Sequence, residues 1–131
     1  MLRRNDFEIL RRYRRPLQSV LVLEDDGLLS LMLEDLVRDE GAVEVHACHD
    51  LQTALEVART TDLDCAILDV SLHEGANYDV ADVLAARGVR FLFSTGLNAN
   101  DIVARHRQRP ILFKPYSDAD FKAALGAALA D

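Results

Sequence analysis

Apolar and polar positions alternate along the chain in two kinds of block. Short apolar runs recur between longer stretches in which apolar residues stand three and four positions apart. The short runs predict buried strands, and the longer stretches predict amphipathic helices that cover them. Strands are therefore predicted at 19–23, 43–47, 65–69, 89–93 and 110–113.

A helix is predicted after each strand, and most of these helices have a recognisable start or stop signal. Gly41 and Gly88 end the first and third helices, as glycine commonly does. Ser117 with Asp120 forms a variant capping box before the last helix. The fourth helix is expected to be short and polar, from Asn98 to about Arg105. The remaining expected cap residues are Asp26 or Gly27, Asp50 and Asn77.

The alternation of strands and helices predicts an α/β fold. A parallel sheet with helices on both faces is the usual result of such a pattern. Right-handed crossovers permit few strand orders, and the common five-stranded one is the flavodoxin-like (βα)5 order 2-1-3-4-5. With 131 residues, half of them apolar, the chain suits one such domain.

Charge divides the chain into a basic start and an acidic body. Residues 1–16 hold six arginines against one aspartate and one glutamate, a net +4, which leaves the other 115 residues at −11. We expect 1–17 to be an extension and 18–131 the domain. A helical arm could pack on its own domain, on a second copy in a homodimer or on a partner, and a solvated tail is the alternative. The acidic body gives no support for binding nucleic acid or a membrane.

The two cysteines and the hydropathy pattern point to a cytoplasmic location. Cys48 and Cys65 lie in strand-like runs without a metal or redox spacing, so buried free thiols are expected. No apolar run approaches the length of a bilayer span, and the arginine-rich start does not resemble a secretory signal.

Acidic residues follow two strands that the predicted order makes neighbours. Asp69 ends the third strand, and Glu24, Asp25 and Asp26 follow the first. The carboxyl ends of parallel strands are where ligands gather. Carboxylates crowded at that edge repel one another, so we expect a cation to hold them. Mg²⁺ suits such oxygen ligands.

The fourth and fifth strands add a hydroxyl and an ammonium at the same edge. Thr95 follows the fourth strand, and Lys114 follows the fifth. Phosphoryl transfer to a carboxylate needs a nucleophilic oxygen, a metal, and donors for the oxygens of the transferring group. Asp69, the acidic pair, Thr95 and Lys114 supply these parts.

In four segments the sequence resembles the receiver domain of two-component response regulators. These segments are Val20 to Asp26, Ala66 to Val70, Phe93 to Gly96 and Phe113 to Tyr116. The resemblance runs from about residue 19 to residue 131, so it implies a stand-alone, single-domain response regulator. The segment 93–96, Phe-Ser-Thr-Gly, is further similar to the Phe-x-Thr-Gly motif of a subgroup common in alphaproteobacteria.

The resemblance implies a phosphorelay protein rather than an enzyme. Asp69 is then the phosphoryl acceptor, and the donor is a histidine of a sensor kinase or a phosphotransfer protein. Glu24 and Asp25 match the acidic pair that holds Mg²⁺, completed by Asp69 and the backbone carbonyl of Ser71.

The same resemblance implies a conformational switch that a protein partner reads. Thr95 matches the switch hydroxyl, and Lys114 matches the lysine whose bond to Pro115 is expected to be cis. The stretch from Gly96 to Arg105 is expected to shift on phosphorylation. Many receivers keep an aromatic three residues before the lysine, and Ile111 stands there, so the aromatic half of the switch is in question.

The residues allow three other interpretations. A degenerate receiver would bind a protein partner without phosphorylation, since fold does not fix function. A haloacid-dehalogenase-type phosphatase would need a second aspartate where Ser71 stands. The run from His46 to His49 invites a metal site, but strand alternation sends His46 and Cys48 to one face and His49 to the other.

Overall fold

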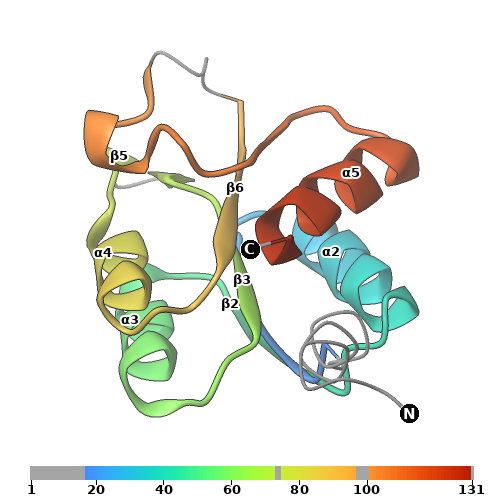
Figure 1. The fold of residues 1–131 in the computed structure, drawn as a ribbon, viewed down its shortest axis with the longest axis horizontal. Helices are drawn as coiled ribbons and strands as arrows, with labels where there is room; N and C mark the ends of the chain where they lie inside the picture. The colour runs from blue at the N-terminus through green and yellow to red at the C-terminus, as the bar shows by residue number, and fades with distance from the viewer. Residues whose placement is uncertain (1–16, 73–74, 97–100, 131) are drawn as a thin grey trace, which may run out of the picture.

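The computed structural model describes residues 17–72, 75–96 and 101–130, which form three layers. A five-stranded parallel sheet lies between helices α3 (Leu51–Thr60) and α4 (Asp79–Ala86) on one face and α2 (Gly27–Asp39) and α5 (Asp118–Leu129) on the other (Figure 1). The predicted α/β class is confirmed.

The strand order is β2-β1-β3-β6-β7, which is the predicted 2-1-3-4-5 order. All four pairings are parallel. Observed bounds differ from the predicted ones by up to two residues, and the fourth predicted strand runs on to Thr95. The strands are β1 (Ser19–Leu23), β2 (Glu44–Cys48), β3 (Cys65–Leu68), β6 (Phe91–Thr95) and β7 (Ile111–Phe113).

Alternate residues of the central strands fill the two cores. Leu21 and Leu23 of β1 face α3 and α4, whereas Val20 and Val22 face α2 and α5. All five residues of β1 are buried, because both faces of a parallel sheet are covered. Edge strand β2 is wetter, as predicted.

Most of the expected helix signals are present in the structure. Asp26 Oδ1 accepts a hydrogen bond from Leu29 N at 3.0 Å, and Asp50 Oδ1 accepts one from Thr53 N at 2.8 Å. Both hydrogen bonds of the capping box at Ser117 form. The N-cap of α4 is Tyr78 instead of the expected Asn77, although Asn77 Oδ1 accepts a hydrogen bond from Asp79 N.

The predicted fourth helix is wrong in the part that the structure describes. Its residues 98–100 lie outside the described ranges, and 101–105 form no α-helix. Residue 101 and the short element η2 (Ala104–His106) have 3-10 conformation instead. Tertiary contacts decide this conformation: Ile102 is fully buried, and the backbone N–H of Val103 donates to the hydroxyl of Tyr78 instead of to a helical carbonyl.

A short hairpin that the sequence did not predict follows β3. It pairs β4 (Ser71–Leu72) with β5 (Gly75–Ala76) in antiparallel register. The basic extension cannot be compared with the structure, because residues 1–16 lie outside the described ranges. Among the described residues, no helix has the length and apolar character needed to cross a bilayer.

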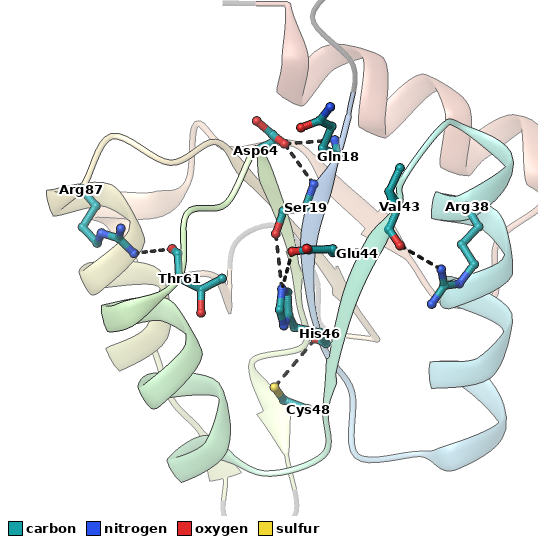
Figure 2. A network of polar contacts seen from close by, with 10 residues as sticks. All are labelled: Gln18, Ser19, Arg38, Val43, Glu44, His46, Cys48, Thr61, Asp64 and Arg87. Carbon is teal, nitrogen blue, oxygen red and sulfur yellow. Dashed lines mark hydrogen bonds and ion pairs between the residues drawn. The ribbon is translucent and has the colours of Figure 1, made fainter.

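Polar contacts tie the amino-terminal ends of the strands together (Figure 2). The Asp64 carboxylate accepts hydrogen bonds from the backbone N–H groups of Gln18 and Ser19, both at 3.0 Å. Arg87 donates to the Thr61 carbonyl at 2.8 Å and so holds the end of α4 against the end of α3. These contacts are at the opposite end of the sheet from the predicted site.

Candidate functional site

The carboxyl ends of four neighbouring strands bring the predicted site residues together. Glu24 and Asp25 follow β1, Asp69 follows β3, Thr95 ends β6, and Lys114 follows β7. Backbone hydrogen bonds hold these ends in register: Asp69 N donates to Leu23 O, and Lys114 N donates to Thr95 O, both at 2.9 Å. The sheet therefore gathers residues that are up to 90 positions apart in sequence.

Three carboxylates form an acidic cluster at this edge. One side-chain oxygen each of Glu24, Asp25 and Asp69 lies within 4.8 Å of the others. Glu24 is 0% exposed and Asp69 is 3% exposed, so two of the carboxylates are almost completely removed from water.

The ammonium of Lys114 compensates the two buried carboxylates. Its Nζ lies 2.6 Å from Glu24 Oε1 and 2.9 Å from Asp69 Oδ2. The side chain of Lys114 is 21% exposed, which makes this a largely shielded ion pair. One cation thus bridges the first and third strands of the chain across the sheet.

The electrostatics of the cluster follow from burial and this bridge. Burial raises the pKa of Glu24 to about 7; the hydrogen bond to Lys114 opposes the rise, and the hydrogen bond with Asp69 adds to it. Burial by itself would lower the pKa of Lys114, but its hydrogen bonds to Glu24 and Asp69 outweigh burial and raise it. Lys114 therefore stays protonated at neutral pH.

The Asp69 carboxylate is oriented from both sides. The backbone N–H of Ser71 donates to Oδ1 at 2.8 Å, while Lys114 Nζ donates to Oδ2 at 2.9 Å. Thr95 is fully buried at the end of β6, next to Lys114 in the backbone pairing. The peptide bond between Lys114 and Pro115 is cis, as expected.

One contact at the site was not foreseen. His49, directly after β2, places Nδ1 3.0 Å from the backbone carbonyl oxygen of Glu24 and helps to fix the loop that carries the acidic pair. No spacing in the sequence signals a side-chain contact to a backbone atom 25 residues away. His46, on β2, instead contacts Ser19 Oγ at 3.3 Å and Glu44 Oε2 at 3.7 Å (Figure 2).

The donor set of the cluster fits a magnesium ion. Carboxylate oxygens are the hard ligands that Mg²⁺ prefers, and three of them converge here. A divalent ion would also relieve the repulsion between carboxylates that one lysine compensates only in part. The proposed contribution of the Ser71 carbonyl stays a prediction.

Comparison with solved structures shows the same architecture in response regulators. SdrG from Sphingomonas melonis Fr1 is 37% identical, has a TM-score of 0.73, and the match covers 86% of this chain and 97% of that one. A BeF3-activated conformation of SdrG, from Pseudomonas melonis Fr1, gives a TM-score of 0.70 at the same identity, covering 87% of this chain and 98% of that one. The receiver domain of the response regulator PhyR from Erythrobacter litoralis is 25% identical with a TM-score of 0.74, covering 88% and 92% of the two chains.

A curated relative agrees with these structures, although no protein-family model matches the chain. The transcriptional regulatory protein PdtaR of Mycobacterium tuberculosis is 30% identical over 116 residues, which are 86% of this chain. The match spans 57% of the length of that relative. Because the strand order, the acidic cluster and the similarity to SdrG and PhyR all agree, the chain belongs to the receiver domains of two-component response regulators.

Proposed function

We propose that this receiver accepts a phosphoryl group on Asp69 from a histidine of a sensor kinase or a phosphotransfer protein and passes the signal to a protein partner. The observation that supports this most strongly is the arrangement around Asp69. Its carboxylate belongs to a cluster of three acids, and its Oδ2 accepts a hydrogen bond from the largely shielded ammonium of Lys114 at 2.9 Å. A carboxylate that served only as a cap or turn residue would not need either feature.

Glu24, Asp25, Asp69 and the carbonyl of Ser71 would hold Mg²⁺ in this proposal. When bound, the ion supplies positive charge against the oxygens of the incoming phosphoryl group. Lys114 adds a second positive charge beside Asp69, and both charges would be effective because the site is largely buried.

The transfer itself requires little movement of Asp69. A carboxylate oxygen forms a bond to phosphorus while the bond between phosphorus and the donor histidine nitrogen breaks, and the electron pair leaves with that nitrogen. The hydrogen bond from Ser71 N to Oδ1 and the ammonium on Oδ2 hold the carboxylate plane in place for this step.

After transfer, the hydroxyl of Thr95 would donate to a phosphoryl oxygen, and the new arrangement would be the one that the partner recognises. The BeF3-activated form of SdrG supports a switch of this kind, because that protein adopts an activated conformation with a phosphoryl-like ligand. Position 111 holds an isoleucine, partly buried against the core on the α3 and α4 side, so no aromatic ring at this position can rotate together with Thr95.

Labelling with acetyl phosphate tests the proposed acceptor. The purified chain should gain one phosphoryl group in the presence of Mg²⁺, as seen by intact-mass spectrometry, and Asp69→Asn should gain none. Asp62→Asn is the matched control, because Asp62 is fully exposed at the far end of the sheet. Equal labelling of Asp69→Asn and the control would disprove the assignment. No labelling of any variant would favour a receiver that binds its partner without phosphorylation.

A further inference from the structure

Residues 101–107 follow the expected switch residue Thr95 in the sequence, and we call them the post-switch segment. A second group of charged side chains lies between this segment and α4, outside the acidic site. Asp82 of α4 is at its centre. Arg105 donates to both carboxylate oxygens of Asp82, from Nε and Nη2, at 2.9 Å each. Nε2 of His106 lies 2.7 Å from Asp82 Oδ1.

Tyr78, the residue before α4, holds the other end of the post-switch segment. Its hydroxyl donates to the carbonyl of Asp101 at 3.4 Å and accepts from the N–H of Val103 at 3.2 Å. Between these two contacts, Ile102 is fully buried in the core formed with α3 and α4. The segment is thus held at one end by Asp82 of α4, at the other end by Tyr78 directly before α4, and between them by the buried side chain of Ile102.

His106 extends the attachment to the strand that carries Thr95. The residue is 4% exposed, and its ring lies 5.6 Å from Phe91 and 6.0 Å from Phe93, measured between ring centroids. It also stacks on Tyr78, with a centroid distance of 6.0 Å. A buried imidazole bonded to a carboxylate and surrounded by three aromatic rings has one well-defined position.

The factor by which these contacts favour the docked arrangement can be compared with the factor by which a ligand at one site changes an equilibrium at a second site. Full burial of one isoleucine side chain favours the docked arrangement by a factor of roughly 10 to 150. The charge-assisted hydrogen bonds of Asp82 increase that factor, although Arg105 and Asp82 are about half exposed and so contribute modestly. Coupling between two sites typically changes an equilibrium by about 5- to 150-fold. With these hydrogen bonds included, the docked arrangement is favoured by at least as large a factor as such a coupling typically supplies.

We infer that Asp82, together with His106 and Arg105, is a clamp that keeps the post-switch segment docked on α4 both before and after phosphorylation. This inference rests on the proposed function, and it deepens it by naming a part of the switch region that does not move. It also revises the expectation that the whole stretch from 96 to 105 shifts. A partner would then meet the post-switch segment as a constant surface, and recognition of the phosphorylated state would depend on other residues.

Hydrogen exchange measured by mass spectrometry tests the clamp in the full chain, with beryllofluoride and Mg²⁺ as the probe of the activated state. In the wild type, amide exchange in 101–107 should change by less than about twofold when beryllofluoride binds. Asp82→Ala should speed exchange there by at least about tenfold without any ligand, since several contacts are lost together. Asp79→Ala, three residues earlier on α4, removes an exposed carboxylate that attracts Arg105 only through space, so it is the matched control for charge and should change exchange in 101–107 by less than about twofold.

A second variant keeps the test possible if Asp82→Ala does not fold. His106→Phe keeps the ring packing with Phe91 and Phe93 but deletes the hydrogen bond to Asp82, and should speed exchange by about 3- to 10-fold, the value of one hydrogen bond. Unchanged exchange in both variants would overturn the clamp. So would wild-type exchange in 101–107 that rises on beryllofluoride binding to the level of Asp82→Ala.

Fluorine NMR of the same samples separates this inference from the proposed function. A bound beryllofluoride signal in the wild type that is missing in Asp69→Asn supports the acceptor assignment. If no signal forms, the proposed function is wrong, and the statement about the phosphorylated state is wrong with it. The comparison of Asp82→Ala with Asp79→Ala in ligand-free samples then still decides whether the clamp exists.

Discussion

Lys114 is the cation between two buried carboxylates, so removing its charge should destabilise the fold. Its Nζ lies 2.6 Å from Glu24 and 2.9 Å from Asp69, and these acids are 0% and 3% exposed. Lys114→Met keeps most of the apolar stem and deletes the charge. The two carboxylates would then face each other without compensation.

The size of the loss can be bounded from these distances. Two unit charges 2.6 or 2.9 Å apart attract by about 6 kcal/mol at an effective dielectric constant of about 20, before the cost of removing them from water is subtracted. Removing one partner of a buried ion pair usually costs about 3–5 kcal/mol. Glu24 has a pKa of about 7 and can take up a proton to relieve the repulsion. We therefore expect a loss near the lower end, about 3 kcal/mol at pH 7.

Urea unfolding followed by circular dichroism, without Mg²⁺, measures this loss. Lys122→Met is the matched control, because Lys122 is exposed on α5 and should unfold like the wild type. If the free energies of unfolding of the two variants agree within about 1 kcal/mol, Lys114 is not compensating buried charge, and the electrostatic reasoning is wrong.

Adding Glu24→Gln provides an independent check of the same reasoning. In the Lys114→Met background the second substitution removes one of two uncompensated charges, so it should restore part of the lost stability. In the wild-type background it removes a partner of Lys114 and should destabilise. A double variant less stable than Lys114→Met would contradict the argument from charge.

Three further predictions concern groups outside the site. Asp64→Ala should lower the free energy of unfolding by about 1–3 kcal/mol, because two backbone N–H groups lose their acceptor. Asp62→Ala is the control and should cost under about 0.5 kcal/mol. Equal urea unfolding curves for the two variants would refute this prediction. The hydrogen bond from Arg105 holds the pKa of Asp82 at about 2, so its stabilisation is complete above the ordinary value of 3.8 and is lost as pH falls toward 2. The difference in free energy of unfolding between the wild type and Asp82→Ala should therefore become smaller as the pH falls from 3.8 toward 2. A difference that stays constant over this pH range would contradict the prediction. Burial raises the pKa values of Cys48 and Cys65 to about 11 and 12, so at pH 8 a disulfide reagent should modify them at least about 100-fold more slowly in the native chain than in urea.

The sequence was sufficient to predict the α/β class, the strand order and the positions of most helices. These features depend on local signals: apolar runs for strands, spacing of three and four for helices, and cap residues such as Asp50 and Ser117 at helix starts. The convergence of Asp69 and Lys114 followed from the strand order, because residues at the carboxyl ends of neighbouring parallel strands must lie at one edge.

Contacts between distant side chains were decided by the tertiary structure alone. The polar pattern after Thr95 predicts a helix, but burial of Ile102 and the hydrogen bonds of Tyr78 hold that backbone in another form. The contact of His49 with the Glu24 backbone and the clamp at Asp82 likewise join groups 24 or 25 residues apart. The local sequence pattern indicates the conformation that each segment prefers by itself. The contacts described here form only after the sheet has brought the segments together, and their combined free energy exceeds the local preference.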